Sequence, residues 1–102
     1  MLEEYKSFIN SEGEATIPYG YYTIEESAFS NCIELRSVVI PSSVTSIERF
    51  AFNGCKNLVS VELPNSISKI GWYAFSCCEQ LTDIEIPEIS RGIILEWDTP
   101  IG

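Results

Sequence analysis

Histidine is absent from this sequence of 102 residues, and its absence excludes several kinds of active site. Ser-His-Asp and Cys-His catalysis both need an imidazole, which is also the commonest general base of enzymes. No Gly-x-Gly-x-x-Gly or Walker-type loop is present to hold a phosphate. A glycosidase-like carboxylate pair among Glu62, Asp83 and Glu85 stays conceivable, but acidic residues on a solvated face are usually simple surface. We therefore expect no catalytic residue and no enzyme.

Basic residues are few and scattered. The chain has 6 Lys and Arg against 15 Asp and Glu, which gives a formal net charge of −9. A nucleic-acid-binding protein needs clustered Lys and Arg to neutralise phosphates, and an anionic membrane surface attracts the same clusters. We therefore expect neither nucleic acid nor a membrane surface as a partner.

Long apolar runs are also lacking. Aliphatic runs such as 38–40 and 93–95 are only three residues long, whereas a membrane-spanning helix needs roughly 18 apolar residues. The start, Met-Leu-Glu-Glu-Tyr-Lys, has no basic segment followed by an apolar one, so we expect no signal peptide. Because a domain from the interior of a secreted protein would look the same, this observation assigns no compartment.

An internal repeat of 23 residues organises the chain. When Ile17, Ile40, Leu63 and Ile86 are aligned, the sequence stays in register without a gap. Six columns are then identical in three successive copies: Pro18/Pro41/Pro64, Ile24/Ile47/Ile70, Ala28/Ala51/Ala74, Phe29/Phe52/Phe75, Cys32/Cys55/Cys78 and Leu35/Leu58/Leu81. Agreement of this kind is characteristic of a solenoid in which each coil packs only on its neighbours.

The columns predict the structure of one coil. The run from Leu35 to Pro41 alternates apolar and variable residues near its end, which indicates a short strand with one buried face. Copies of this strand pair in parallel, because the chain travels round a full coil between them. Residues 44–47 and 67–70 indicate a second extended segment, and the Ala-Phe pair suits a single helical or 3₁₀ turn. The fold class expected is a mainly-β repeat solenoid with a short parallel sheet.

The repeat divides the chain into three parts. They are a degenerate repeat or N-terminal cap at 1–16, three regular repeats at 17–85, and a degenerate repeat or cap at 86–102. Near the start, Tyr5 and Ile9 fall in the Ala and Cys columns, but Lys6 breaks the Phe column. An amphipathic helix through Leu2, Tyr5 and Ile9 is the alternative for this segment.

The unit Ile-Pro-x-x-Val-x-x-Ile-x-x-x-Ala-Phe-x-x-Cys-x-x-Leu-x-x-Val-x is fullest at 40–62 and 63–85. It resembles the repeat of the BspA-like leucine-rich repeat family, and the resemblance covers residues 17 to about 95. It implies a right-handed solenoid with a parallel sheet on its concave side. It also implies a secreted or cell-surface protein, an adhesin that binds host or bacterial proteins and has no catalytic or cofactor site.

Four cysteines in a short chain suggest either disulfides or a metal site. Cys32, Cys55 and Cys78 occupy one equivalent position per coil, so we expect buried free thiols. Neighbouring coils would bring their α-carbons to about 5 Å, so a bridge stays an alternative. Zinc needs converging ligands such as a Cys-x-x-Cys pair, and the chain has none, so we expect no metal and no cofactor. Cys77 stands in a variable column, and we expect it at the surface.

A protein-binding module is the first function that the repeat allows. Its candidate concave face consists of the outward strand columns Ser37/Ser60/Asp83 and Val39/Glu62/Glu85, with Arg36, Val59 and Thr82 at the rim. Four strands about 4.8 Å apart give a face of roughly 250 Å², whereas a standard interface buries about 800 Å² per partner. The face is therefore small for tight binding by itself.

A structural, self-associating unit is the second function. Uncapped solenoid ends expose apolar side chains and unpaired strand edges, which favour pairing between chains. The candidate residues at the C-terminal end are Ile93, Ile94, Leu95 and Trp97. Closed twofold pairing through this end would make a homodimer.

Overall fold

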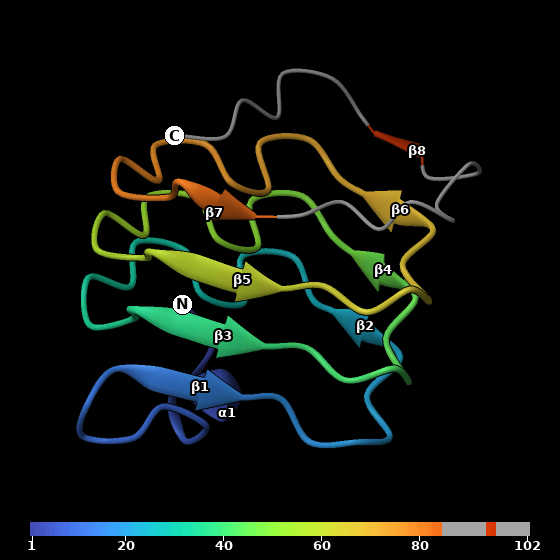
Figure 1. Ribbon diagram of the computed structural model, residues 1–102, viewed down its shortest axis with the longest axis horizontal. Coiled ribbons are helices and arrows are strands. Elements are labelled where there is room, and N and C mark those ends of the chain that lie inside the picture. Colours follow the sequence, from blue (N-terminus) through green and yellow to red (C-terminus); the bar gives the residue numbers. More distant parts are fainter. Residues whose placement is uncertain (85–93, 96–102) are drawn as a thin grey trace.

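The computed structural model describes residues 1–84 and 94–95, and they form a stack of coils with two parallel sheets. Figure 1 shows the strands in two columns, with one strand of each column in every coil. The first sheet contains β1 (Glu14–Thr16), β3 (Ser37–Val39), β5 (Ser60–Glu62) and β7 (Asp83–Ile84). The second contains β2 (Thr23–Ile24), β4 (Ser46–Ile47), β6 (Lys69–Ile70) and β8 (Ile94–Leu95). Within the described ranges the single helix is α1 (Glu3–Lys6).

Pairing follows the sequence repeat. Ser37 pairs with Ser60 in the first sheet, and Ile47 pairs with Ile70 in the second, so partners from β1 to β7 are 23 residues apart. The last pair departs from this spacing, because Ile70 pairs with Leu95, which lies 25 residues further on. All six strand pairs of the described residues, from β1–β3 to β6–β8, are parallel. The predicted mainly-β solenoid is therefore confirmed, and the second extended segment of each coil is a strand of its own sheet.

The core lies between the two sheets and is built from the invariant columns. The Ile, Ala, Phe, Cys and Leu columns are all buried, with 0–3% of each side chain exposed. Phe52 stacks on Phe29 with ring centroids 5.2 Å apart, and on Phe75 at 5.1 Å with only 3° between the ring planes. This continuous ring stack explains why Phe recurs in the three regular coils, since a smaller side chain would leave a cavity.

The Ala-Phe segment is a run of hydrogen-bonded turns where a single helical or 3₁₀ turn was predicted. In the first regular coil, the N–H groups of residues 28, 30 and 32 donate to carbonyls three residues earlier. The alternate N–H groups, those of residues 27, 29 and 31, donate to Arg49, Ala51 and Asn53 of the next coil. A helical turn would direct every N–H along its own axis and leave none for the neighbouring coil, so the stack favours alternation.

This alternation places residues in the left-handed region of backbone conformation. Two columns have positive φ in every regular coil: Ser27/Phe50/Tyr73 at 57–61° and Asn31/Gly54/Cys77 at 58–79°. Gly and Asn are the residues that adopt this region most readily. Bulky Phe50 and Tyr73 are unusual there, and their rings stack on each other at 5.5 Å with 4° between planes.

The N-terminal end of the stack is closed by the first thirteen residues. Tyr5 of α1 is fully buried, and its ring meets Phe29 edge-on at 5.3 Å, in the place where Lys6 interrupts the Phe column. Ile9 forms an antiparallel bridge with Ala15, which covers the free edge of β1. The amphipathic helix considered for this segment is limited to the four residues of α1, and Ile9 lies beyond it.

At the C-terminal end, the structure describes the backbone of β8 alone. The predicted repeat or cap at 86–102 otherwise lies outside the described residues, as do Glu85, Ile93 and Trp97 of the predicted surfaces.

Candidate functional site

The outward side of the first sheet carries the residues predicted for binding. Ser37 lies opposite Ser60, and Ser60 lies opposite Asp83, so the first predicted column is in register across three coils. Val39 lies opposite Glu62 in the second column. Because Val38 and Val61 point into the core between these columns, strand alternation directs Ser37, Val39, Ser60 and Glu62 outward. We call the surface of Ser37, Val39, Ser60 and Glu62 the sheet face.

The sheet face is accessible and has no internal polar partners. Val39 is 42% exposed, Glu62 is exposed, and the two serines are partly buried. Within residues 1–84 the side chains of Ser37, Ser60 and Glu62 have neither a hydrogen bond nor an ion pair with another part of the chain. Their hydrogen-bonding capacity is therefore available to solvent or to a partner.

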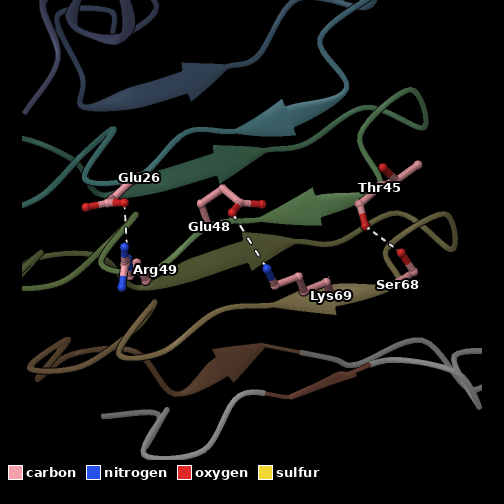
Figure 2. A network of polar contacts seen from close by, with 6 residues as sticks. All are labelled: Glu26, Thr45, Glu48, Arg49, Ser68 and Lys69. Carbon is pink, nitrogen blue, oxygen red and sulfur yellow. Dashed lines mark hydrogen bonds and ion pairs between the residues drawn. The ribbon is translucent and has the colours of Figure 1, made fainter.

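The second sheet has the opposite character. Figure 2 shows polar side chains that link one coil to the next across its outward side. Arg49 Nε lies 3.1 Å from Glu26 Oε1, and Lys69 Nζ lies 3.8 Å from Glu48 Oε1. The Ser68 hydroxyl donates to the carbonyl oxygen of Thr45 at 3.1 Å. These side chains pair with a side chain or a backbone carbonyl of the preceding coil, so they link the coils and leave little unmatched polarity for a ligand.

A groove runs beside the sheet face, along the loops that precede β1, β3, β5 and β7. It is an open depression of about 670 Å³, and its walls include Gly13, Arg36, Val59 and Gln80, one from each of four coils. We call it the rim groove. Arg36 and Val59 were predicted at the rim of the sheet face, and Thr82, the third rim residue, is also exposed. Gly13 and Gln80 were not predicted. Gln80 is exposed in a variable column beside a strand, which could have indicated it, whereas Gly13 is buried.

The three ladder cysteines are structural. Cys32, Cys55 and Cys78 are buried free thiols, as predicted, and Cys77 is exposed. The Cys55 thiol donates to the carbonyl of Phe29 at 3.0 Å, and the Cys78 thiol donates to that of Phe52 at 3.1 Å. Burial raises the pKa of the Cys55 thiol well above its usual range and raises the pKa of Cys78 to about 11. Buried, protonated thiols of this kind are unreactive at neutral pH.

The part of the chain that the structure describes contains neither a metal-binding cluster nor a membrane-spanning helix. No group of three or more Cys, Asp or Glu side chains there could hold a metal ion. The same residues contain no helix with the length and hydrophobicity needed to cross a membrane.

Two parallel sheets built on a 23-residue repeat, with Ile, Phe, Cys and Leu columns buried between them, define a leucine-rich repeat protein. A family model described as the BspA-type leucine-rich repeat region of six copies matches residues 4–94. The chain therefore belongs to the BspA-type leucine-rich repeat family.

Solved structures agree with this assignment. The chain is similar to a leucine-rich repeat protein of T. pallidum, with a TM-score of 0.71 and 32% identity over 76% of this chain. It is equally similar to a leucine-rich repeat protein from Bacteroides ovatus, with a TM-score of 0.70 and 32% identity over 74% of this chain. It spans 39% of the first protein and 22% of the second. No curated protein sequence matches it.

Proposed function

We propose that the chain is a non-catalytic protein-binding module and that the sheet face is part of its contact surface. The observation that carries this proposal is the difference between the two sheets. Polar side chains on the second sheet pair between coils, whereas Ser37, Ser60 and Glu62 on the sheet face have no partner within residues 1–84. Evenly spaced strands therefore present variable, unpaired side chains on a fixed scaffold, which suits recognition of another protein.

Family membership supports the same class of function and extends it. Members of the BspA-like family act at the cell surface or outside the cell, where they bind host or bacterial proteins. We extend this role to the present chain, as an adhesin repeat. The acidic balance of the chain favours partners with basic surfaces, since unlike charges accelerate association.

A binding screen with paired variants tests this function. The chain would be immobilised and exposed to arrayed extracellular matrix proteins and bacterial surface proteins, with binding measured by surface plasmon resonance. Val39→Arg with Ser60→Arg should abolish binding to any specific partner. The matched control, Ser46→Arg, lies on the outward side of the second sheet and should leave binding unchanged. Equal binding by all three proteins would refute the role of the sheet face.

Self-association through the C-terminal end is the second proposal, resting on the apolar residues Ile93, Ile94, Leu95 and Trp97. Closure of the N-terminal end by Tyr5 and Ile9 confines such pairing to the other end. Each chain carries a net charge of −9, so salt should strengthen a homodimer by screening the repulsion. Light scattering at low and high salt tests this, and a monomer at high concentration in both would exclude it.

A further inference from the structure

The rim groove contains an arginine whose position is set by a glycine. Gly13 has a φ of +80° and is buried beneath the side chain of Arg36. A Cβ atom at Gly13 would lie 2.7 Å from Arg36 Cγ, and 2.5 Å from the carbonyl oxygen of Glu34. Only glycine therefore allows the aliphatic stem of Arg36 to lie across this part of the backbone. The backbone of Arg36 is held to the same residue, because its N–H donates to the Gly13 carbonyl at 2.7 Å.

The guanidinium group at the end of this stem is unpaired. Over residues 1–84 it has no hydrogen bond and no ion pair, although the chain has more than twice as many acidic as basic residues. Arg49, in contrast, is paired with Glu26. A guanidinium presents a rigid fork of N–H donors that matches a carboxylate or a phosphate. The rim groove thus holds a positioned anion-binding group that the fold itself leaves unused.

Neighbouring charges select among possible anions. Glu12 and Glu34 also line the rim groove, and their carboxylates repel a phosphate dianion or a cluster of acidic residues more strongly than one carboxylate. A single acidic side chain between neutral residues is the anion that this arrangement accepts best.

The remaining walls favour a peptide over a small acid. Ile33 is 61% exposed and Val59 is 45% exposed, so both offer apolar contact beside the arginine. Gln80 adds an amide group that can bond to a peptide backbone, and Asn57, whose Nδ2 donates to the Ile33 carbonyl at 2.8 Å, offers its amide oxygen. Four coils at about 4.8 Å spacing give a groove of roughly 14 Å, which accommodates about four residues of extended chain.

We propose that the rim groove binds an extended segment of a partner protein, with one Asp or Glu paired to Arg36 and an adjacent apolar side chain on Val59 and Ile33. This site deepens the proposed protein-binding function, on which it rests. It also enlarges the contact surface beyond the sheet face, because the groove runs along the loops at the N-terminal ends of the strands of the first sheet.

A peptide titration followed by nuclear magnetic resonance tests the site. The probe is acetyl-Ser-Val-Ser-Asp-Ser-Val-Ser-amide, whose symmetrical order places Val near Asp in either chain direction. We expect shifts at the Arg36 side chain, Gly13, Val59 and Gln80. Replacing Asp by Asn in the peptide, or introducing Arg36→Gln in the protein, should weaken binding at least about tenfold. A loss of this size corresponds to one charge-assisted hydrogen bond. Arg49→Gln, on the other flank, is the matched control and should bind as the unmodified chain does.

Three outcomes would overturn the site without pointing to another surface. They are equal binding of the Asp and Asn peptides, shifts from sodium acetate that equal those from the peptide at the same concentration, and no shift at the groove residues at millimolar peptide. Shifts confined to Ser37, Val39, Ser60 and Glu62 would also reject the rim groove but support the sheet face. The failure of this site is therefore distinguishable from failure of the proposed function.

Discussion

The hydroxyl of Tyr5 accepts a hydrogen bond from the backbone N–H of Glu25 at 3.2 Å. The same hydroxyl donates to the carbonyl oxygen of Thr23 at 3.4 Å. These two backbone groups flank Ile24 in β2, the first strand of its sheet, whose outer edge has no strand beside it within the described residues. One side-chain hydroxyl thus supplies both the donor and the acceptor that a preceding coil would have supplied.

Tyr5→Phe should therefore destabilise the chain while leaving the ring packing intact. Removing the hydroxyl leaves the Glu25 N–H and the Thr23 carbonyl without this partner, at a cost of about 1–2 kcal/mol in the free energy of unfolding. Urea denaturation followed by circular dichroism measures the change. Tyr22→Phe is the control, since Tyr22 is 73% exposed and should show no change. Equal stability of Tyr5→Phe and Tyr22→Phe would mean that the hydroxyl does not close the edge.

Phe52→Ala should be among the most damaging core substitutions. Its ring lies between Phe29 and Phe75 and is fully buried, so the variant loses two ring contacts and leaves a cavity. The expected loss is about 3–5 kcal/mol, a large part of the total stability of a chain of this size. Thermal denaturation against the control Tyr19→Ala, at a residue 78% exposed, measures it. A melting temperature within a few degrees of the unmodified chain would contradict the ring stack.

Thiol labelling should separate Cys77 from the other cysteines. A maleimide reagent at neutral pH should label the native chain once, because only Cys77 is exposed, and the denatured chain four times. Mass spectrometry counts the labels, and Cys77→Ser should reduce the native count to zero. Rapid labelling of all four sites in the native chain would show that the ladder cysteines are accessible.

Stability should fall in alkaline solution because of the buried thiols. Burial raises the pKa of Cys32, Cys55 and Cys78 above the ordinary value of 9.0, and that of Cys78 to about 11. The unfolded chain therefore loses these protons first as the pH rises. The stability that the buried, protonated thiols contribute is complete below pH 9 and is lost as the pH rises through their pKa values in the folded chain. Each thiol contributes a slope of up to about 1.4 kcal/mol per pH unit in this window. Urea denaturation between pH 7 and 10.5 measures the slope, and a flat profile would contradict it.

Cys77→Gly should stabilise the chain. Cys77 has a φ of 62°, and the equivalent position in the preceding coil is Gly54. Relief of the left-handed strain is worth about 1 kcal/mol. Cys77→Ala keeps the strain and is the matched control, with no expected gain. If Gly and Ala variants unfold at the same urea concentration, the backbone at this position carries no strain.

The sequence pattern predicted which side chains are buried but did not predict the backbone conformation of the turns. The buried Phe, Cys and Leu columns and both strands of each coil follow from apolar periodicity, which reports burial directly. The left-handed column at Ser27, Phe50 and Tyr73 could not be recognised, because it contains none of the glycines that usually mark such positions. The alternating turns were missed for the same reason.

Contacts between a side chain and distant backbone were equally hidden. Nothing in a repeat alignment indicates that the Tyr5 hydroxyl would bond to the backbone around Ile24, or that Gly13 would lie under Arg36. The outward strand positions were predictable, since alternation assigns them a face. Their role in binding stays a prediction.

The backbone hydrogen bonds between coils run along the stack and join residues about one repeat apart, as from Phe29 to Ala51 and from Phe52 to Ala74. Because each coil contacts only its neighbours, a force that pulls on one end of the chain can detach the outermost coil while the rest of the stack stays paired. Each event would release 23 residues, or about 80 Å of extended chain. An array of such coils would lengthen in steps under load and keep the remaining coils folded, so the outward strand positions of those coils would stay in register.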